Sequence, residues 1–479
     1  MTYDRAPYET TPAQEAVYHR YAALALPRHT SYPAASFWND EFPQGTYQQL
    51  LGETFAGGDI SLYLHVPFCH QLCYYCACNK LILPKDDPKS EEFGKQLLGT
   101  LLREIERCAG AAPAGKKPVV RQLHFGGGTP TWLSTAQLDV LFEKLAQHFS
   151  FPSDGERAME LDPRVTSEDH LRVLRQFGFN RISLGVQDFD AGVQEAVNRI
   201  QPFELVSKFV DTSRRLGFDL INFDLIYGLP FQTEATMAKT IEQVFLLEPT
   251  RIAFYRLAVI PEIFKWQRRF SQVNMPESDL CLRLNLSAIN RFRDAGFQFI
   301  GLDHFARPED SLSIALKDET ITRTFQGMTT GRGLPVIGIG PSAISQFPSA
   351  FAQSEADFYK WTRLTETSLD GFAVNRGAFL STDDCIRREL LVDLYCYREI
   401  DKARLQRRTG IDFDSYFAEE LLRLVPLVNE GFVELTPAAV KLTRPLGELL
   451  IRVVAAVFDK YLPKDALSKG IAGKASRVG

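Results

Sequence analysis

The most reactive side chains in this sequence are four cysteines crowded into one short segment. Cys69, Cys73 and Cys76 follow the spacing C-x3-C-x2-C, and Cys78 comes shortly after them. Three thiolates on one loop can bind three irons of a 4Fe-4S cubane and leave the fourth iron open to a small ligand. A structural zinc site would need a second ligand pair, and none follows nearby. The spacing therefore predicts a 4Fe-4S cluster bound by Cys69, Cys73 and Cys76, with zinc or buried structural cysteines as the alternatives.

A glycine-rich segment, Gly126-Gly127-Gly128-Thr129-Pro130, follows the next predicted strand. Glycines lack side chains, so the backbone of such a segment can approach a ligand closely. Alone, a glycine triplet indicates only a turn between a strand and a helix. One βα unit after the cysteines, it resembles the pattern of radical S-adenosylmethionine (SAM) enzymes, whose glycine loop cradles the methionine end of the cofactor.

The elements that must position these loops follow a regular alternation. Short β-rich segments alternate with longer segments of helical periodicity. Candidate strands cover residues 61–66, 122–125, 157–161, 181–186, 219–226, 251–257, 297–301 and 336–339. Segments 91–107, 135–148, 167–177 and 203–216 have the apolar spacing of amphipathic outer helices. The alternation predicts an α/β fold built as a partial TIM-like (βα)6 barrel.

Residues of interest lie at or just beyond the ends of the proposed strands. They are Cys69, Gly126, Asp162, Gln187, Gly228 and Ala258. In α/β barrels, ligands bind at the C-terminal ends of the strands, where the βα loops converge. We therefore expect the site there.

Three regions are expected along the chain. Residues 1–60 should form an irregular arm with little helix, because Pro27, Pro33 and Pro43 interrupt it, and the arm should cover the active site. Residues 61–365 should hold the barrel and its extension strands. Residues 366–479 should form a mainly helical domain, with helices at 383–397, 414–424 and 446–461 and a hairpin of 427–435 with 440–442.

Composition indicates a soluble protein. The hydrophobic share of 45%, the charged share of 24% and the formal charge of -5 are ordinary for globular proteins. Basic residues alternate with acidic ones, which argues against nucleic-acid binding. Residues 1–15 lack the apolar run of a secretory signal, and the apolar stretch 446–462 is too short and too charged to span a bilayer. We expect a cytoplasmic monomer that does not bind membranes.

Over nearly its full length the chain resembles the oxygen-independent coproporphyrinogen III oxidases, also called coproporphyrinogen dehydrogenases. The matching segments are 28–33 (RHTSYP), 63–69 (YLHVPFC), 122–130 (QLHFGGGTP), 185–189 (GVQDF), 224–230 (DLIYGLP), 303–308 (DHFARP), 325–327 (FQG), 342–345 (SAIS) and 384–388 (DCIRR).

The resemblance implies two S-adenosyl-L-methionine molecules beside the cluster. The first would lie near the glycine loop opened by Gly126 and contact Tyr63, Gly128, Glu160 and Ile344. The second would lie near Tyr75, Thr129, Pro130, Gln187, Arg199, Asp224 and Ala258. An acid can bind ribose hydroxyls or an ammonium group, and an arginine can bind a carboxylate. Taken singly, Glu160, Asp224 and Arg199 would more often be helix caps or surface ion pairs.

The catalytic candidates are Cys78, Tyr63 and His65. The resemblance implies that Cys78 binds no iron yet is needed for catalysis, whereas the alternative for this position is a small buried hydrophobe. His65 would by default be a core histidine with its hydrogen bonds satisfied.

The resemblance also implies the reaction. A 5′-deoxyadenosyl radical would abstract hydrogen from the propionates on rings A and B of coproporphyrinogen III. Loss of CO2 would leave vinyl groups and give protoporphyrinogen IX in haem biosynthesis under anaerobic conditions. A flavodoxin- or ferredoxin-type protein or a reductase would donate electrons. Because the substrate carries four carboxylates, Arg28 and Arg307 are candidates for binding them.

Four segments depart from the family pattern. His29 stands where the family usually has Tyr, Tyr75 where Phe is common, and GPS at 340–342 where GVS is usual. After the sixth strand, YRLAVIP at 255–261 replaces a more polar segment at the barrel mouth. Two alternatives therefore remain. One is a radical SAM enzyme that methylates or opens another tetrapyrrole. The other is a haem chaperone, although its His-Asn-x-x-Tyr motif is missing here.

Overall fold

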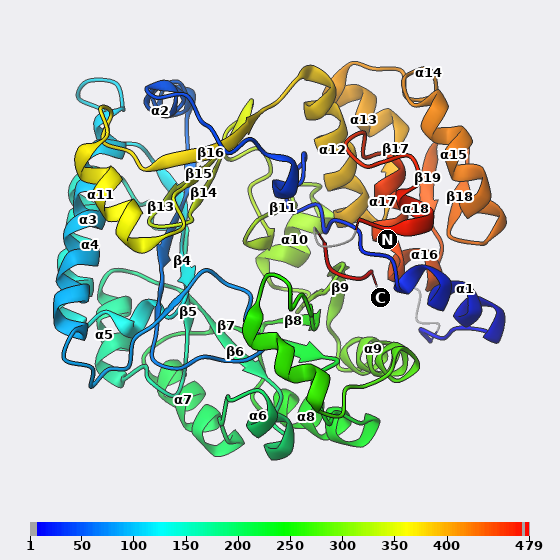
Figure 1. Cartoon of the computed structure of the whole chain (residues 1–479), viewed down its shortest axis with the longest axis horizontal. Coiled ribbons are helices and arrows are strands. Elements are labelled where there is room, and N and C mark those ends of the chain that lie inside the picture. The colour runs from blue at the N-terminus through cyan, green and yellow to red at the C-terminus, as the bar shows by residue number, and fades with distance from the viewer. Residues whose placement is uncertain (1–6, 472–474, 479) are drawn as a thin grey trace.

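The computed structural model describes residues 7–471 and 475–478. Its centre is a 12-stranded sheet in which β13, β1 and β4 to β8 are neighbouring parallel strands (Figure 1). Their bounds are β1 Ile60–Val66, β4 Val120–Gly127, β5 Glu156–Leu161, β6 Arg181–Gln187, β7 Leu220–Tyr227, β8 Arg251–Arg256 and β13 Val336–Ile339. The prediction of a partial barrel of six βα units is confirmed.

Amphipathic helices pack on the outside of these strands (Figure 1). They include α3 (Ser90–Gly110), α4 (Thr135–His148), α5 (Glu168–Gln176), α7 (Phe203–Arg215) and α8 (Glu234–Leu246). In α4, Leu138, Leu141 and Leu145 are fully buried, as the spacing of one helical face requires. The helix begins at a capping box in which Ser134 and Gln137 satisfy each other's backbone N–H. This start fixes where the preceding glycine loop ends.

Antiparallel strands extend the sheet at both edges. β14 (Ile344–Gln346), β15 (Ala350–Ser354) and β16 (Val374–Phe379) follow β13, and β10 (His304–Ala306) and β9 (Gln298–Gly301) follow β8. The strand pattern was expected to stop near residue 366, and this was wrong, because β16 pairs with β15 as part of the central sheet.

The N-terminal region contains more helix than expected. α1 (Pro12–Ala22) and α2 (Thr46–Gly57) occupy much of it. Pro12 lies at the start of α1, where proline is tolerated, and Pro27, Pro33 and Pro43 all lie between the two helices. The prediction of little helix in residues 1–60 was therefore wrong.

The C-terminal region is mainly helical and shares a core with the N-terminal arm. Its elements include α12 (Thr382–Tyr397), α14 (Phe413–Tyr416), α15 (Ala418–Asn429), α16 (Leu446–Leu449) and α17 (Ile451–Val457). Strands β18 (Val433–Leu435) and β19 (Ala439–Leu442) form the expected hairpin, but residues 427–429 end α15 instead of beginning a strand. Leu26 and Tyr32 of the arm pack into this core. Within the described residues, no helix combines the length and the apolar run needed to cross a bilayer.

Candidate active site

The cysteine loop is closed by two short parallel strands, β2 (Phe68–Cys69) and β3 (Leu81–Ile82). The Leu81 N–H donates to the Pro67 carbonyl at 2.7 Å, and the Leu83 N–H donates to the Cys69 carbonyl at 2.8 Å. Residues 70–80 between these strands carry Cys73, Cys76 and Cys78. The loop therefore begins and ends on a fixed base at the C-terminal end of β1.

Three side chains, one from the loop itself and two from residues 266 and 267, donate hydrogen bonds to carbonyls of the cysteine segment. Lys80 Nζ and Trp266 Nε1 both donate to the Cys76 carbonyl, at 3.1 and 3.2 Å. Gln267 Nε2 donates to the Tyr75 carbonyl at 3.2 Å. The Lys80 ammonium also lies 4.1 Å from the centre of the Trp266 ring. These contacts fix the backbone between the second and third cysteines, so the thiols need not order the loop themselves.

The glycine loop lies directly against the cysteine loop. The Gly128 N–H donates to the Val66 carbonyl at 2.7 Å, and the Thr129 N–H donates to the Phe68 carbonyl at 2.8 Å. A Cβ added at Gly128 would meet the Phe68 oxygen at 2.6 Å, and one added at Gly126 would meet Glu160 Oε1 at 2.8 Å. A side chain at Gly128 would push the two loops apart, and one at Gly126 would collide with the Glu160 carboxylate, which is the physical reason for these glycines.

A cavity of about 350 Å³, called here the cysteine cavity, lies beside these loops. Its lining includes Cys69, Cys73, Tyr75, Cys76, Cys78, Gly127, Gly128, Thr129, Glu160, Asp162, Arg164, Ser183, Gln187, Arg199, Asp224 and Tyr255. These side chains come from the C-terminal ends of β1, β4, β5, β6, β7 and β8. The structure thus brings the predicted strand ends together at one edge of the barrel.

Two arginines lie close to a cysteine sulfur in this cavity. Arg199 Nη1 donates to Cys73 Sγ at 3.6 Å, and Arg164 Nη2 donates to the same sulfur at 3.7 Å. Both also bind Asp162, at 3.2 and 2.6 Å. Although burial opposes it, Arg199 and Arg164 hold the pKa of Asp162 well below its ordinary value. The cavity therefore holds a compact charged network beside the thiols.

A second cavity of about 440 Å³, the tyrosine cavity, is lined by Tyr63, His65, Cys78, Gly127, Glu160 and Ile344, together with residues of β11 (Thr322–Thr324) and the turn after it. It shares Cys78, Gly127 and Glu160 with the cysteine cavity. The two cavities adjoin at the glycine loop, so groups bound in them would be neighbours.

The hydrogen bonds of His65 define its tautomer. Its Nε2 lies 3.0 Å from the Asn79 carbonyl, which can only accept, so Nε2 carries a proton. Its Nδ1 lies 3.0 Å from the Tyr63 hydroxyl, which then donates to it. Burial lowers the pKa of His65, in agreement with a neutral ring. The expectation that His65 has satisfied hydrogen bonds holds, and the Tyr63 hydroxyl is oriented toward the histidine.

Most predicted site residues line one or both cavities, but some do not. Gly126 and Pro130 lie in the glycine segment behind the lining residues, and the Ala258 carbonyl accepts a hydrogen bond from Gln267 at 3.0 Å. Arg307 lies against the Phe297 ring and donates to the Ala295 carbonyl, so it does not line the cavities described here. Gly126 and Ala258 were placed correctly near strand ends, but neither lies in the wall of the two cavities.

Sequence reasoning missed several lining residues. Asp162 was expected at a strand end, but its ion pair with Arg199 has no local signal in the sequence, because Arg199 lies 37 residues away. Ser183 and Tyr255 lie inside strands and point into the barrel, which alternation alone could have suggested. Gln187 has a left-handed φ of 66° and a buried Oε1 without a hydrogen-bond partner in the described part of the chain. Such an unpaired acceptor fits a bound ligand.

The donor set fits a 4Fe-4S cluster. The three thiols of Cys69, Cys73 and Cys76 line one cavity, and Thr129 Oγ1 lies 3.7 Å from Cys69 Sγ, as a donor to a thiolate would. No three Cys, His, Asp or Glu side chains among the described residues are grouped as ligands of one metal ion. A cubane takes one thiolate on each of three irons, so its ligands stand apart. Cys69, Cys73 and Cys76 would hold the cluster.

The carboxyl of Asp224 gives a testable pH dependence. Burial and the nearby Glu160 raise its pKa to about 6, despite hydrogen bonds from Asn222 and Ser183. Because the folded-state pKa is raised, ionising Asp224 costs folding free energy, and this cost grows as pH rises from about 4 to above 6. We expect Asp224→Asn to stabilise the cofactor-free protein by about 1–3 kcal/mol at pH 8 and by much less near pH 4.5.

Urea unfolding of both proteins at pH 4.5, 6 and 8 measures this difference. Asp211→Asn, at an exposed position on the outer helix α7, is the control and should change little at any pH. A stability difference between Asp224→Asn and the unaltered protein that stays constant across pH would contradict the raised pKa.

Comparison with known proteins identifies the family. The radical SAM superfamily pattern matches residues 63–244, and the HemN C-terminal domain pattern matches residues 380–445. The chain is 40% identical over 445 residues to the oxygen-independent coproporphyrinogen III oxidase of Pseudomonas aeruginosa, covering 92% of this chain and 94% of that protein. Identity to the Escherichia coli protein of that name is 38% over 440 residues, covering 92% and 94%.

A solved structure agrees with the sequence relatives. Coproporphyrinogen III oxidase (HemN) from Escherichia coli, described as a radical SAM enzyme, matches with a TM-score of 0.84 and 36% sequence identity, covering 94% of this chain and 99% of that one. The resemblance that the motifs indicated is thereby confirmed. The chain belongs to the family of oxygen-independent coproporphyrinogen III oxidases within the radical SAM superfamily.

Proposed function

We propose that this enzyme converts two propionates of coproporphyrinogen III to vinyl groups without oxygen and so forms protoporphyrinogen IX in haem biosynthesis. The observation that carries the proposal is the pair of adjoining cavities that share Cys78, Gly127 and Glu160 beside three cysteines. The family to which the chain belongs supports the choice of substrate.

The presence of two adjoining cavities supports the proposal that two S-adenosylmethionine molecules bind side by side. Tyr63, Glu160 and Ile344, proposed for the first molecule, line the tyrosine cavity. Tyr75, Thr129, Gln187, Arg199 and Asp224, proposed for the second, line the cysteine cavity. When bound, the cluster and S-adenosylmethionine would supply a 5′-deoxyadenosyl radical for hydrogen-atom abstraction.

The chain's own residues position the reactants. Abstraction of a hydrogen atom from the propionate β-carbon, followed by loss of CO2 and of one electron to an external acceptor, leaves a vinyl group. We propose that Tyr63 and His65 form a neutral wall of the cavity, since the Tyr63 hydroxyl donates to His65 and His65 in turn donates to the Asn79 carbonyl. Cys78 lies where both cavities meet, within reach of either bound molecule. The described part of the N-terminal arm, residues 7–60, would cover the site and exclude water.

In the segment that departs from the family pattern after the sixth strand, Tyr255 lines the cysteine cavity, whereas the three changes that follow it do not line either cavity. Leu257 is buried in a small apolar cluster with Ile226 and Leu229, and Val259 is exposed to solvent. Neither lines the cavities described above, and Arg256 does not either. At these three positions the departure leaves the walls of the two cavities unchanged, which supports the ordinary substrate of the family.

The experiment is a turnover assay with anaerobically reconstituted protein, S-adenosylmethionine, coproporphyrinogen III and a flavodoxin-type reductant. We expect two CO2 and two vinyl groups per substrate molecule. A methylated product, or tight haem binding without turnover, would reject the assignment. Because we propose a cytoplasmic monomer, light scattering of the same preparation should give the mass of a single chain.

A further inference from the structure

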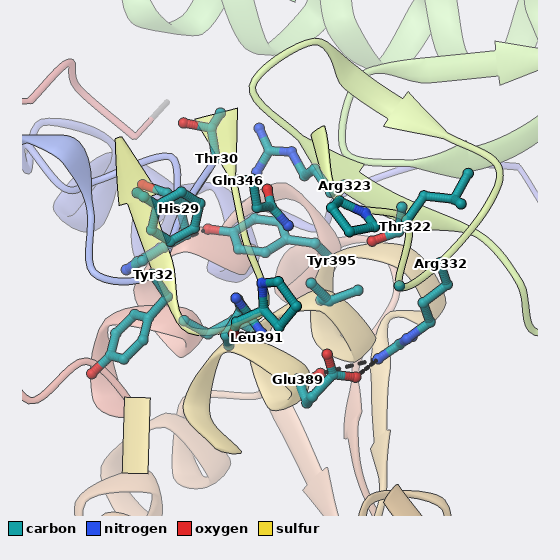
Figure 2. A pocket seen from close by; sticks show the side chains of 18 of the residues that line it. His29, Thr30, Tyr32, Thr322, Arg323, Arg332, Gln346, Glu389, Leu391 and Tyr395 are labelled. Atoms are coloured by element: carbon teal, nitrogen blue, oxygen red, sulfur yellow. Dashed lines mark hydrogen bonds and ion pairs between the residues drawn. The ribbon is translucent and has the colours of Figure 1, made fainter. Parts of the chain in front are cut away.

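A third cavity lies between the N-terminal arm and the C-terminal region, and the proposed cofactor residues do not line it. This arginine cavity, of about 200 Å³, is lined by His29 of the arm, Arg323 of β11, Gln346 of β14, and Arg388 and Tyr395 of α12. Figure 2 shows His29 and Tyr395 facing one another at this cavity, with the Arg332–Glu389 ion pair on its other side. Arm, barrel extension and C-terminal region therefore all contribute to its wall.

The charges in the arginine cavity are not balanced. Glu389 is the only acid among its lining residues, and it is paired with Arg332 at 2.7 Å. Arg388 donates only to the carbonyls of Phe347 and Pro348, at 3.4 and 3.0 Å. Within the described residues, neither Arg323 nor Arg388 has a carboxylate at ion-pair distance.

Of these two arginines, Arg323 is the stronger evidence for an anion-binding site, because it is only 8% exposed. Its guanidinium donates to the Arg28 carbonyl and lies 4.8 Å from the centre of the Tyr395 ring. Asp303 lies close enough to interact electrostatically with Arg323, but the carboxylate of Asp303 is paired with His304 Nδ1 at 2.7 Å. A buried guanidinium without a carboxylate partner is costly, and an anionic ligand would remove that cost.

The size and place of the cavity define the ligand. Pockets for whole small molecules measure about 300–1,000 Å³, so a cavity of about 200 Å³ suits a side chain of a larger ligand. Gln346 lines both the arginine cavity and the tyrosine cavity, and β11 contributes residues to both. The two cavities therefore adjoin at Gln346, so a tetrapyrrole that lies against S-adenosylmethionine in the tyrosine cavity could extend one substituent into the arginine cavity.

We propose that the arginine cavity is the subsite for one propionate carboxylate of the tetrapyrrole, with Arg323 as its principal ligand and Arg388 as the second. This inference rests on the proposed function, because it takes its ligand from the proposed substrate. A guanidinium can bind a carboxylate through two parallel hydrogen bonds. The subsite would fix which propionate stays in place while another reaches the reaction centre.

The test uses coproporphyrin III, a stable tetracarboxylate, and its tetramethyl ester, with binding to anaerobically reconstituted protein followed by fluorescence. Loss of a hydrogen bond to a charged group corresponds to about a 10- to 100-fold change in affinity. We expect Arg323→Gln to weaken coproporphyrin III binding by that factor and to leave binding of the ester unchanged. Arg323→Lys should recover part of the loss. Arg388→Gln, in a less buried position, should show the same discrimination with a smaller loss.

Arg103→Gln is the matched control, because this half-buried arginine pairs with Glu366 and lines none of the three cavities. Equal binding of coproporphyrin III by Arg323→Gln, Arg388→Gln and the unaltered protein would overturn the proposal. An equal loss of ester binding would also overturn it, because it would indicate a structural defect. The unaltered protein could bind coproporphyrin III and yet release no CO2 from coproporphyrinogen III in the turnover assay. The proposed function would then fail, while the comparison of coproporphyrin III with its ester would still test the subsite.

Discussion

Alanine at any one of Cys69, Cys73 and Cys76 is expected to abolish S-adenosylmethionine cleavage, with a loss of at least about 100-fold. Each thiolate would bind one iron of the cluster, so no remaining ligand can take its place. Iron and sulfide content, the electron paramagnetic resonance signal of the reduced protein, and 5′-deoxyadenosine formation measure the effect. The fall in bound iron should accompany the fall in cleavage, since both follow from loss of the same bond.

Two further cysteine variants serve as controls for that experiment. Cys385→Ala removes a thiol on α12, outside the cysteine loop, and should retain iron and activity. Cys78→Ala should retain the cluster but lose decarboxylation, because we propose that Cys78 acts at the junction of the cavities without binding iron. Zinc in the purified protein, or cleavage that survives replacement of Cys69, Cys73 or Cys76, would contradict the cluster assignment.

The barrel could be predicted because its strands are buried on both faces. Such strands appear in a sequence as short apolar runs between amphipathic helices, and β1, which is buried along nearly its whole length, is an example. The arm was less predictable, since its prolines were treated as helix breakers without regard to position. Pro12 begins α1, and a capping box between Thr11 and Gln14 supports this start. The position of a proline relative to the start of a helix, which the residue type alone does not show, decides whether the proline breaks the helix or begins it.

The site was predictable where its residues share a loop and less so where they meet through the fold. The cysteine spacing is local, and the structure places Cys69, Cys73 and Cys76 in one cavity wall. The ion pair of Asp162 with Arg199 joins segments that follow neighbouring strands, and neither segment has a sequence pattern that predicts the other as its partner. The unpaired charge of Arg323 becomes visible only when the arm, β11 and α12 are brought together.

The hardest feature to predict was whether the side chain of a residue near a strand end points into the cavity or away from it. Ala258 follows β8 as expected, yet it contributes a carbonyl to the Gln267 contact and no side chain to the cavity. Tyr255, three residues earlier, points into the barrel and lines the cysteine cavity. Register alternates side chains between the two faces of a strand, but the turn that follows ends this alternation. The positions of the strand ends therefore predict where the site lies, but they do not predict which side chains line its cavity.

Replacing Gly127 with alanine should damage both stability and chemistry more than any other single-methyl change in the glycine loop. Gly127 has a φ of 109°, which side chains rarely adopt, and an added Cβ would lie 2.5 Å from His65 Cε1. Backbone strain and overpacking each cost about 1–3 kcal/mol, so we expect a loss of about 3–5 kcal/mol in the free energy of unfolding. Displaced His65 would release both Tyr63 and the Asn79 carbonyl.

Gly115→Ala separates the two causes, because Gly115 also has a positive φ, of 75°, but an added Cβ there would meet nothing within 4 Å. It should lose only the strain component of about 1–2 kcal/mol and keep full activity. Cofactor cleavage by Gly127→Ala should fall by on the order of 100-fold, since small displacements of aligned groups have effects of that size. Urea unfolding and 5′-deoxyadenosine formation measure the two effects. If the two alanine variants were equally stable and equally active, the close packing of the glycine loop against His65 could not be what aligns the site.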